Sequence, residues 1–334
     1  MRKIKVAQIG VMHDHARDAI RALKSMTDVF ELIGYAHPDS DDFDKKFYED
    51  IQEMSAEEIL SYPGLDAVVI ETQEKDLTKY AIMAAQKGLH IHLDKPGGFE
   101  EEEFDRFIDM VKEKNLVLSM GYMYRFNPSI KKALEIVKSG KLGRIYSVEG
   151  QMSCYLPKEK REWLNNFPGG MMFYLGCHLT DVVLQCMGSF PDEIIPFNGA
   201  IKHEGTTSYD YSMAVYTYDT VASFIKTTML EHGGFLRRHI VICGTEGTIE
   251  INPTEYHPIL NERELASDMY VTYKDEQLKM GVDARGKRTQ SETYDRYKEM
   301  LTKFKETVTG ETENTYDLEY ERNLYKTVLA SCGK

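Results

Sequence analysis

Two adjacent residues in HIHLDKPGG (90–98), Asp94 and Lys95, have types suited to proton transfer. They end a short apolar stretch, and Pro96 stops the strand there because it fixes φ and has no N–H to donate. A lysine at a strand tip can hydrogen-bond a substrate hydroxyl and help a neighbouring base to remove its proton. The simpler alternative is that Lys95 is a surface lysine that pairs with Asp94.

A second candidate is GVMHDH (10–15), which follows the apolar stretch IKVAQI. A strand, a glycine and a helix open dinucleotide-binding units, whose usual pattern is G-x-G-x-x-G. Gly10 can make the tight turn, but the bulky Met12 stands where a second glycine normally lets the backbone approach the pyrophosphate. Backbone amides at a helix start still offer partial positive charge to a phosphate. The stretch is therefore consistent with a nucleotide site or with an ordinary helix start.

The residue types at the end of the second strand leave the nucleotide open. An acid that binds the adenosine ribose is expected about 20 residues past the glycines. His37 stands there, in YAHPD, with Asp39 two positions later. The missing acid would admit a 2′-phosphate, whereas Asp39 could bind the ribose instead. His13, His15 and His37 raise the question of a metal, but no carboxylate or thiolate has ligand spacing with them, so we expect none.

The elements that position these residues follow two alternating periods over the first 120 residues. We expect strands at 3–9, 30–37, 65–72, 90–96 and 116–122, and helices at 15–26, 55–62, 75–88 and 101–115. Ser55 and Glu58 form a capping box at the start of one helix. Strands that alternate with single helices predict a doubly wound parallel sheet, which binds ligands at the carboxyl ends of its strands.

The pattern changes from about residue 123. A helix at 128–140 leads into strand-like stretches at 144–155, 209–219, 221–230, 237–244 and 247–252, and helices at 291–310 and 316–332 follow. Runs of strands without intervening helices predict an open antiparallel sheet. The expected fold class is therefore α/β plus α+β, with one domain at 1–121 and a second at 122–334.

Composition excludes several classes of function. A chain of 334 residues exceeds what one core usually serves, which favours two domains. The net charge of −13 repels phosphate backbones and anionic lipid, and no apolar run approaches the ~20 residues that span a bilayer. We therefore expect neither a nucleic-acid nor a membrane partner. Five scattered cysteines and the lack of a signal-peptide pattern favour a cytoplasmic protein.

Nearly the whole chain resembles the glucose-fructose oxidoreductase/inositol dehydrogenase (Gfo/Idh/MocA) family. The resemblance rests on the opening at Gly10, on 68–96 with its E-K-P-type end, on GYMYRFNP (121–128), on GKLGRIYSVEG (140–150) and on PGGMMFYLGCHLTDVV (168–183). It implies an N-terminal Rossmann domain and a C-terminal domain on an open antiparallel sheet. It also implies an NAD(P)-dependent oxidoreductase that moves hydride between nicotinamide and a hydroxyl or carbonyl of a sugar or cyclic polyol. Homo-oligomers, dimers or tetramers, are implied as well.

The same resemblance assigns catalytic residues. Lys95 matches a lysine that contacts substrate and the nicotinamide ribose, and His178 in GCHLTD matches a histidine near the reacting hydroxyl. Asp181 lies three residues on, on the same helix face. Sugar dehydrogenases of the family carry an Asp where this chain has Tyr174, and a tyrosine of pKa about 10 is a poor base unless Lys95 lowers it. His178 is then the expected base, or else a buried histidine that pairs with Asp181.

Binding residues complete the expectation. The expected cofactor is NAD or NADP, with NAD preferred, and the expected cofactor-binding residues are Gly10, Val11, Met12, His13, His37, Thr72, Gln73, Asp94, Lys95 and Arg125. Trp163 and Asn165 are substrate candidates, since an aromatic ring with nearby amides suits a sugar, although Trp163 can equally anchor its loop.

Departures from the family pattern leave two other functions open. Tyr174 in place of the acid permits a hydrolase or lyase that uses NAD transiently, through oxidation, elimination and re-reduction. The incomplete glycine loop permits a non-catalytic member that binds a nucleotide or another ligand.

Overall fold

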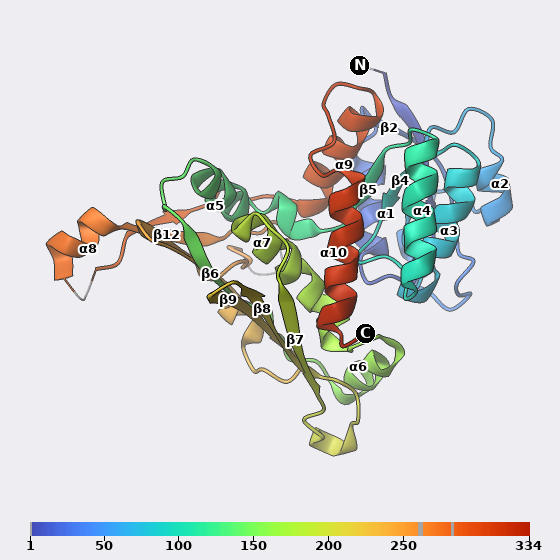
Figure 1. The fold of residues 1–334 in the computed structure, drawn as a ribbon. Coiled ribbons are helices and arrows are strands. Elements are labelled where there is room, and N and C mark those ends of the chain that lie inside the picture. The colour runs from blue at the N-terminus through green and yellow to red at the C-terminus, as the bar shows by residue number, and fades with distance from the viewer. Residues whose placement is uncertain (1, 260–262, 282–283) are drawn as a thin grey trace. The chain divides into compact units, whose positions relative to one another are not determined.

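The computed structural model describes residues 2–259, 263–281 and 284–334, which form two compact units (Figure 1). The first unit holds the chain up to Tyr122 together with Arg296–Tyr325, and the second holds Met123–Asp295 and Lys326–Lys334. From sequence we expected a continuous second domain at 122–334. Instead, α9 (Arg296–Val308) groups with the first unit, where it packs against α1 (Ala16–Ser25).

The first unit is built on a parallel sheet of five strands in the order β2-β1-β3-β4-β5, as predicted. The strands are β1 (Ile4–Ile9), β2 (Phe30–Ala36), β3 (Ala67–Ile70), β4 (His90–Leu93) and β5 (Leu118–Met120). Every residue of β3 is buried, because helices that connect parallel strands cover both faces of the sheet. Because the strands are parallel, their carboxyl ends, where such sheets bind ligands, all lie at one edge.

The helices of the first unit follow the expected order. They are α1, α2 (Ala56–Leu60), α3 (Leu77–Gln86), α4 (Glu101–Glu113), α9 and the greater part of α10 (Leu318–Ser331). The predicted capping box is present: Ser55 Oγ accepts from the Glu58 amide at 3.2 Å, and Glu58 Oε2 accepts from the Ser55 amide at 2.7 Å. Figure 1 shows α3 and α4 packed side by side.

The second unit is built on an eight-stranded sheet in the order β13-β12-β11-β10-β6-β9-β8-β7. Its strands are β6 (Ile145–Gln151), β7 (Glu193–Gly199), β8 (Tyr211–Tyr218), β9 (Val221–Thr228), β10 (His239–Gly244), β11 (Gly247–Ile251), β12 (Asp268–Tyr273) and β13 (Lys287–Gln290). The pairing is antiparallel as predicted, except that β6 and β9 run parallel, which makes the sheet mixed.

The helices of the second unit are α5 (Pro128–Lys138), α6 (Lys158–Trp163), α7 (Cys177–Met187) and, beyond β12, the short α8 (Lys274–Met280). Of these, α5 and α7 pack against strands in the middle of the sheet. The buried helix α7 packs against β6 (Figure 1), and Gly150 permits this contact because an added Cβ would lie 3.1 Å from the Leu179 side chain. Among the described residues, no helix has the length and apolar character to cross a bilayer.

Candidate functional site

The turn after β1 requires glycine. Gly10 has φ +101°, a conformation that L side chains rarely adopt, and a Cβ there would lie 2.2 Å from the Thr72 backbone nitrogen. The end of β1 thus approaches the end of β3 more closely than a side chain allows. Gly10 makes the tight turn that the sequence predicted.

The loop that follows this turn presents backbone amides to an anion. The carboxylate of Asp39 accepts hydrogen bonds from the amides of Val11 at 3.4 Å, Met12 at 3.3 Å and Gln73 at 3.0 Å. Burial raises the pKa of Asp39, while these amides oppose the shift. Converging amides of this kind suit a carboxylate or a phosphate oxygen. Met12 contributes through its backbone, although it lacks the glycine of the usual pattern.

A pocket of about 490 Å³ opens at the end of β2. Its lining includes His37, Glu53, Glu57, Glu58 and Tyr80. His37 Nε2 lies 3.1 Å from Glu53 Oε1, and His37 Nδ1 lies 3.1 Å from the Ser40 carbonyl oxygen. Both ring nitrogens therefore face acceptors, which favours the imidazolium. Burial alone would lower the pKa of His37, but the hydrogen bonds to Glu53 and Ser40 and the charges of Glu53 and Asp41 raise it.

Glu53 is a pocket residue that sequence reasoning missed. It lies beyond β2, and an isolated parallel bridge between Tyr35 and Glu53 brings it back to the strand end. Tyr35 also donates its hydroxyl to Glu53 Oε2 at 3.2 Å. A single bridge between non-consecutive segments leaves no periodic trace in the sequence, so no local signal could have found it.

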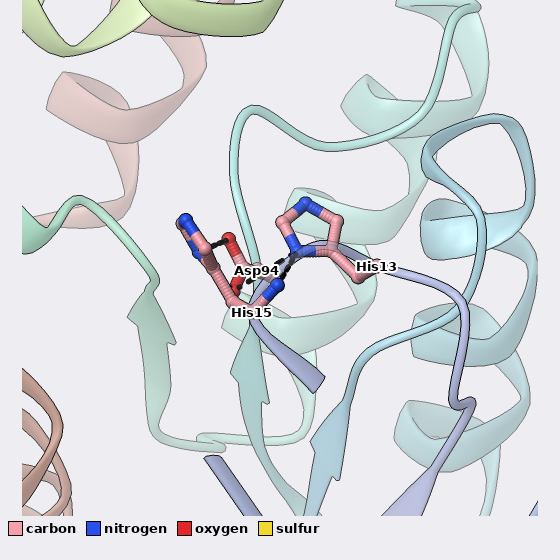
Figure 2. Close-up of side chains that lie close together, drawn as sticks. All are labelled: His13, His15 and Asp94. Carbon is pink, nitrogen blue, oxygen red and sulfur yellow. Dashed lines mark hydrogen bonds and ion pairs between the residues drawn. The ribbon is translucent and has the colours of Figure 1, made fainter. Parts of the chain in front are cut away.

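A buried cluster of histidines and carboxylates occupies the ends of β1, β3 and β4 (Figure 2). The Asp94 carboxylate lies between the two imidazole rings, 2.9 Å from His15 Nδ1 and 3.5 Å from His13 Nδ1. Glu71 Oε2 lies 3.5 Å from the same His13 nitrogen. The sequence showed no carboxylate at ligand spacing from the histidines, because Asp94 is 79 positions from His15 and only the parallel sheet brings them together.

Burial and neighbouring charges shift the pKa values of Glu71, His13 and Asp94 in different directions. Burial, with the Asp94 charge adding to it, raises the pKa of Glu71 well above its usual value. Burial also lowers the pKa of His13 to about 3. Burial would raise the pKa of Asp94 too, but His13, His15 and Lys95 hold it below its ordinary range. The favoured state is a neutral Glu71 and a neutral His13 around an ionised Asp94.

Lys95 is buried beside this cluster, with 1% of the residue exposed. Its backbone N–H donates to Asp94 Oδ1 at 2.6 Å, and its positive charge acts on His13, Glu71 and Asp94. Burying a lysine is costly unless negative groups compensate for it. The ionised Asp94 supplies negative charge for that compensation, and the burial of Lys95 rules out the surface lysine considered from the sequence.

In the second unit, a π-helical turn at Met172–Gly176 leads directly into α7. Such wide turns are frequent at functional sites. Tyr174 lies on this turn, half-buried, with its ring 5.3 Å from Trp163. His178 lies in the first turn of α7, fully buried, with its ring 5.6 Å from Tyr124.

Arg125 and Asp181 form a two-point ion pair inside the second unit. Arg125 Nε donates to Asp181 Oδ2 at 2.9 Å and Nη2 donates to Oδ1 at 3.0 Å, while Gln185 also donates to Oδ2 at 2.9 Å. Both side chains are buried. From sequence, Arg125 was expected to bind the cofactor and Asp181 to act in catalysis. Their mutual pairing ties the turn at Met123–Phe126 to α7.

Matches to known protein families cover both units. Residues 4–122 match the oxidoreductase family with an NAD-binding Rossmann fold, and residues 130–250 match the GFO/IDH/MocA C-terminal domain. The chain belongs to the Gfo/Idh/MocA family. This membership confirms the resemblance drawn from the sequence, and it makes the first unit an NAD(P)-binding Rossmann domain.

Several relatives within this family have assigned names. The scyllo-inositol 2-dehydrogenase (NAD(+)) of Bacillus subtilis is 33% identical over 207 residues, 60% of this chain and 59% of its own length. The D-xylose 1-dehydrogenase (NADP(+)) 2 of Haloferax volcanii is 29% identical over 142 residues, 42% of this chain and 43% of its own length. The chain thus aligns with about half the length of its curated relatives.

Solved structures share the fold over the full chain. The UDP-N-acetylglucosamine 3-dehydrogenase GnnA of Acidithiobacillus ferrooxidans superposes with a TM-score of 0.76 at 16% identity, covering 100% of this chain and 98% of that one. At this identity the likeness shows the fold alone.

The described residues of the first unit are suited to the NAD(P) that this family's Rossmann domain binds. Gly10 makes the turn, the amides of Val11, Met12 and Gln73 converge on the Asp39 carboxylate, and a pocket follows β2. Thr72 supplies the backbone against which Gly10 packs. His13 and Asp94 belong to the buried cluster beside this loop, and Lys95 adjoins it.

The predicted substrate residues lie at the end of α6 and in the short turn that follows it. Trp163 is half-buried, with Phe167 at 4.4 Å on its edge and Lys160 Nζ 3.3 Å from its ring centroid. Asn165 is exposed. The neighbouring Arg161 is buried and anchors the loop through an ion pair with Asp210 at 3.6 Å. Trp163 therefore makes the packing contacts of a loop anchor, and its binding to sugar stays a prediction.

Proposed function

We propose that this chain is an NAD-dependent oxidoreductase that moves hydride between nicotinamide and a CH–OH or carbonyl group of a sugar or cyclic polyol. The observation that carries the proposal is Lys95, buried at the end of β4 beside an ionised Asp94 within an NAD(P)-binding Rossmann domain. The relatives named for scyllo-inositol and D-xylose support the substrate class.

The proposed chemistry assigns a proton role to Lys95 and His178. When bound, the nicotinamide supplies the hydride acceptor. The Lys95 ammonium hydrogen-bonds the substrate oxygen and stabilises the negative charge that develops as its proton leaves. For His178 of the second unit we keep the role of base that the family resemblance implies, since an imidazole is the side chain whose ordinary pKa lies nearest neutrality. Asp181, three residues after His178 on α7, acts as a positioning residue, because its carboxylate is held by Arg125 and by Gln185 of the same helix.

The preferred nucleotide in this proposal is NAD. Three carboxylates, those of Glu53, Glu57 and Glu58, line the pocket at the end of β2 against the single imidazolium of His37. A 2′-phosphate would enter a pocket of net negative charge, whereas the ribose hydroxyls of NAD can donate to a carboxylate. Glu53 takes the ribose role that the sequence left between His37 and Asp39.

To test this, the purified chain is incubated with NAD or NADP and each of a panel of inositols, aldoses and their lactones. The absorbance of the reduced nicotinamide is followed. Net reduction of NAD by at least one polyol or sugar is the expected result. A chain that binds neither NADH nor NADPH in fluorescence titrations would contradict the proposal.

Tyr174 favours a second candidate function, that of a hydrolase or lyase that uses the nucleotide transiently. In such a reaction the nucleotide is reduced and oxidised again within a single turnover. Tyr174 stands in the place of an acid, and one relative, 21% identical over 206 residues, is named a 2,7-anhydro-N-acetylneuraminate hydratase. Product formation without net change in reduced nicotinamide would favour this reaction over simple dehydrogenation.

We also propose that the chain forms homo-oligomers through the open face of its eight-stranded sheet. Ile195, Phe197 and Phe224 are 50%, 58% and 40% exposed. Val215 of β8 pairs with Ile195 of β7 and with Phe224 of β9, so Ile195 and Phe224 lie in one row across the sheet. Apolar faces of this kind commonly become buried between subunits.

A further inference from the structure

We propose that His13, His15, Asp94 and Glu71 form a binding site for a divalent transition-metal ion of the zinc class in the first unit. Nitrogen and oxygen atoms from the ends of three strands converge there, as Figure 2 shows for His13, His15 and Asp94. The potential ligand atoms of these three residues all lie within 4.8 Å of one another. This proposal departs from the expectation, drawn from sequence, that the histidines hold no metal.

The spacing of the atoms suits tetrahedral coordination. Ligand atoms around zinc, at 2.0–2.1 Å from the ion, lie about 3.4 Å from one another. Here Asp94 Oδ2 lies 2.9 Å from His15 Nδ1 and 3.5 Å from His13 Nδ1, and Glu71 Oε2 lies 3.5 Å from His13 Nδ1. Small side-chain rotations bring these atoms to metal distance.

The protonation state of His13 also suits a ligand. Its Nδ1 accepts a hydrogen bond from the His15 amide at 3.2 Å, so this nitrogen carries a lone pair and no proton. Its Nε2 faces the Glu74 carboxylate at 3.7 Å. Metal-bound histidines generally direct their second nitrogen at a carboxylate or carbonyl, which fixes the ring and raises its basicity. The Glu74 carboxylate is placed to orient the His13 ring in this way.

Glu71 provides the independent sign that a cation belongs here. Its carboxyl group is fully buried, with Oε2 3.5 Å from His13 Nδ1, and the side chain with which it shares a hydrogen bond is another carboxyl group, that of Asp94. A buried carboxylate without donors is strongly disfavoured, so a second buried carboxylate beside Asp94 needs a shared proton or a cation. Lys95 contributes one positive charge nearby, and a divalent ion bound here would displace the proton that Glu71 otherwise holds.

The donor set selects the kind of metal. Two imidazoles with two carboxylates favour zinc, cobalt or nickel over magnesium and calcium, which take oxygen ligands. The His15 side chain is 13% exposed, whereas those of His13, Asp94 and Glu71 are at 0%. An ion would therefore enter past His15, and the four protein ligands would complete its tetrahedral shell.

The test titrates the chelator-treated full chain with Co²⁺, followed by visible d–d absorption, and then displaces Co²⁺ with Zn²⁺. We expect saturable binding of a single equivalent with the intense bands of four-coordinate Co²⁺. Asp94→Asn and His13→Asn should weaken binding by about 100-fold or more, since they remove ligands rather than outer-shell groups. His37→Asn, a histidine of the same unit outside the cluster, is the matched control and should bind as the parent does.

A further variant guards against loss of folding. Glu71→Gln keeps the side-chain volume and removes only the anionic ligand, so it should unfold at the parent temperature in chelator and lose the stabilisation that Zn²⁺ gives the parent chain. The proposal is overturned if the parent chain shows no saturable Co²⁺ absorption, or if Asp94→Asn and His37→Asn bind Co²⁺ equally well. No nucleotide is present in this titration, so its failure leaves the proposed oxidoreductase activity untouched.

Discussion

His37 and Glu53 form a hydrogen-bonded pair at the end of β2, with Nε2 and Oε1 3.1 Å apart. The pair lines the pocket in which we place the adenosine ribose. Glu53→Gln removes the charge that accepts a ribose hydroxyl and repels a 2′-phosphate. NADH should bind about tenfold more weakly and NADPH more tightly than in the parent. Fluorescence titration measures both, with the exposed Glu49→Gln as control; unchanged relative affinities would refute the role of Glu53.

The same pair makes stability depend on pH. The pKa of His37 is raised by Glu53 and Ser40 despite burial, so folding favours its protonated form. Its contribution is therefore full below the pKa of the unfolded chain, about 6.5, and is lost as pH rises through the folded value. Denaturant unfolding of the parent and His37→Gln should differ more at about pH 5.5 than at about pH 8.5. The reverse order would show that the imidazolium is not the stabilised form.

Arg125 and Asp181 give a stability prediction for the second unit. Asp181→Asn leaves the buried Arg125 guanidinium without its counter-charge and should lower the free energy of unfolding by about 3–5 kcal/mol. The exposed pair Lys132–Glu135, with its atoms 2.9 Å apart, is the control, and Glu135→Gln there should cost less than about 1 kcal/mol. Equal effects in denaturant unfolding would mean that burial of the first pair carries no energetic weight.

The backbone conformation of Gly10 and its close approach to Thr72 give a prediction for a substitution at this position. Gly10→Ala introduces a Cβ 2.2 Å from the Thr72 nitrogen at φ +101° and should both destabilise the first unit and weaken NADH binding. Gly88→Ala meets the φ penalty alone, at +77° with no atom within 4 Å. It should cost about 1 kcal/mol and leave NADH affinity unchanged. Comparable losses of affinity in both variants would contradict the close approach of β1 and β3.

Local features of this chain were predictable, and contacts between distant segments were not. The Ser55–Glu58 box and the Gly10 turn depend on residues a few positions apart, so their pattern is visible in the sequence. The pairs His15–Asp94 and Arg125–Asp181 join residues 79 and 56 positions apart. These pairs form because the fold brings strand ends and helices together, and the periodic pattern of the sequence does not predict such contacts. Glu53 and the grouping of α9 with the first unit were missed for the same reason.

The most direct measurement is the rate of NAD reduction by the best polyol or sugar of the panel in the parent chain, Lys95→Met and the exposed control Lys87→Met. We expect Lys95→Met to lose about 10²–10⁴-fold in kcat while it still binds NADH, because proton handling and charge stabilisation are lost. Lys87→Met should match the parent. NAD reduction that persists at the parent rate in Lys95→Met would contradict the account.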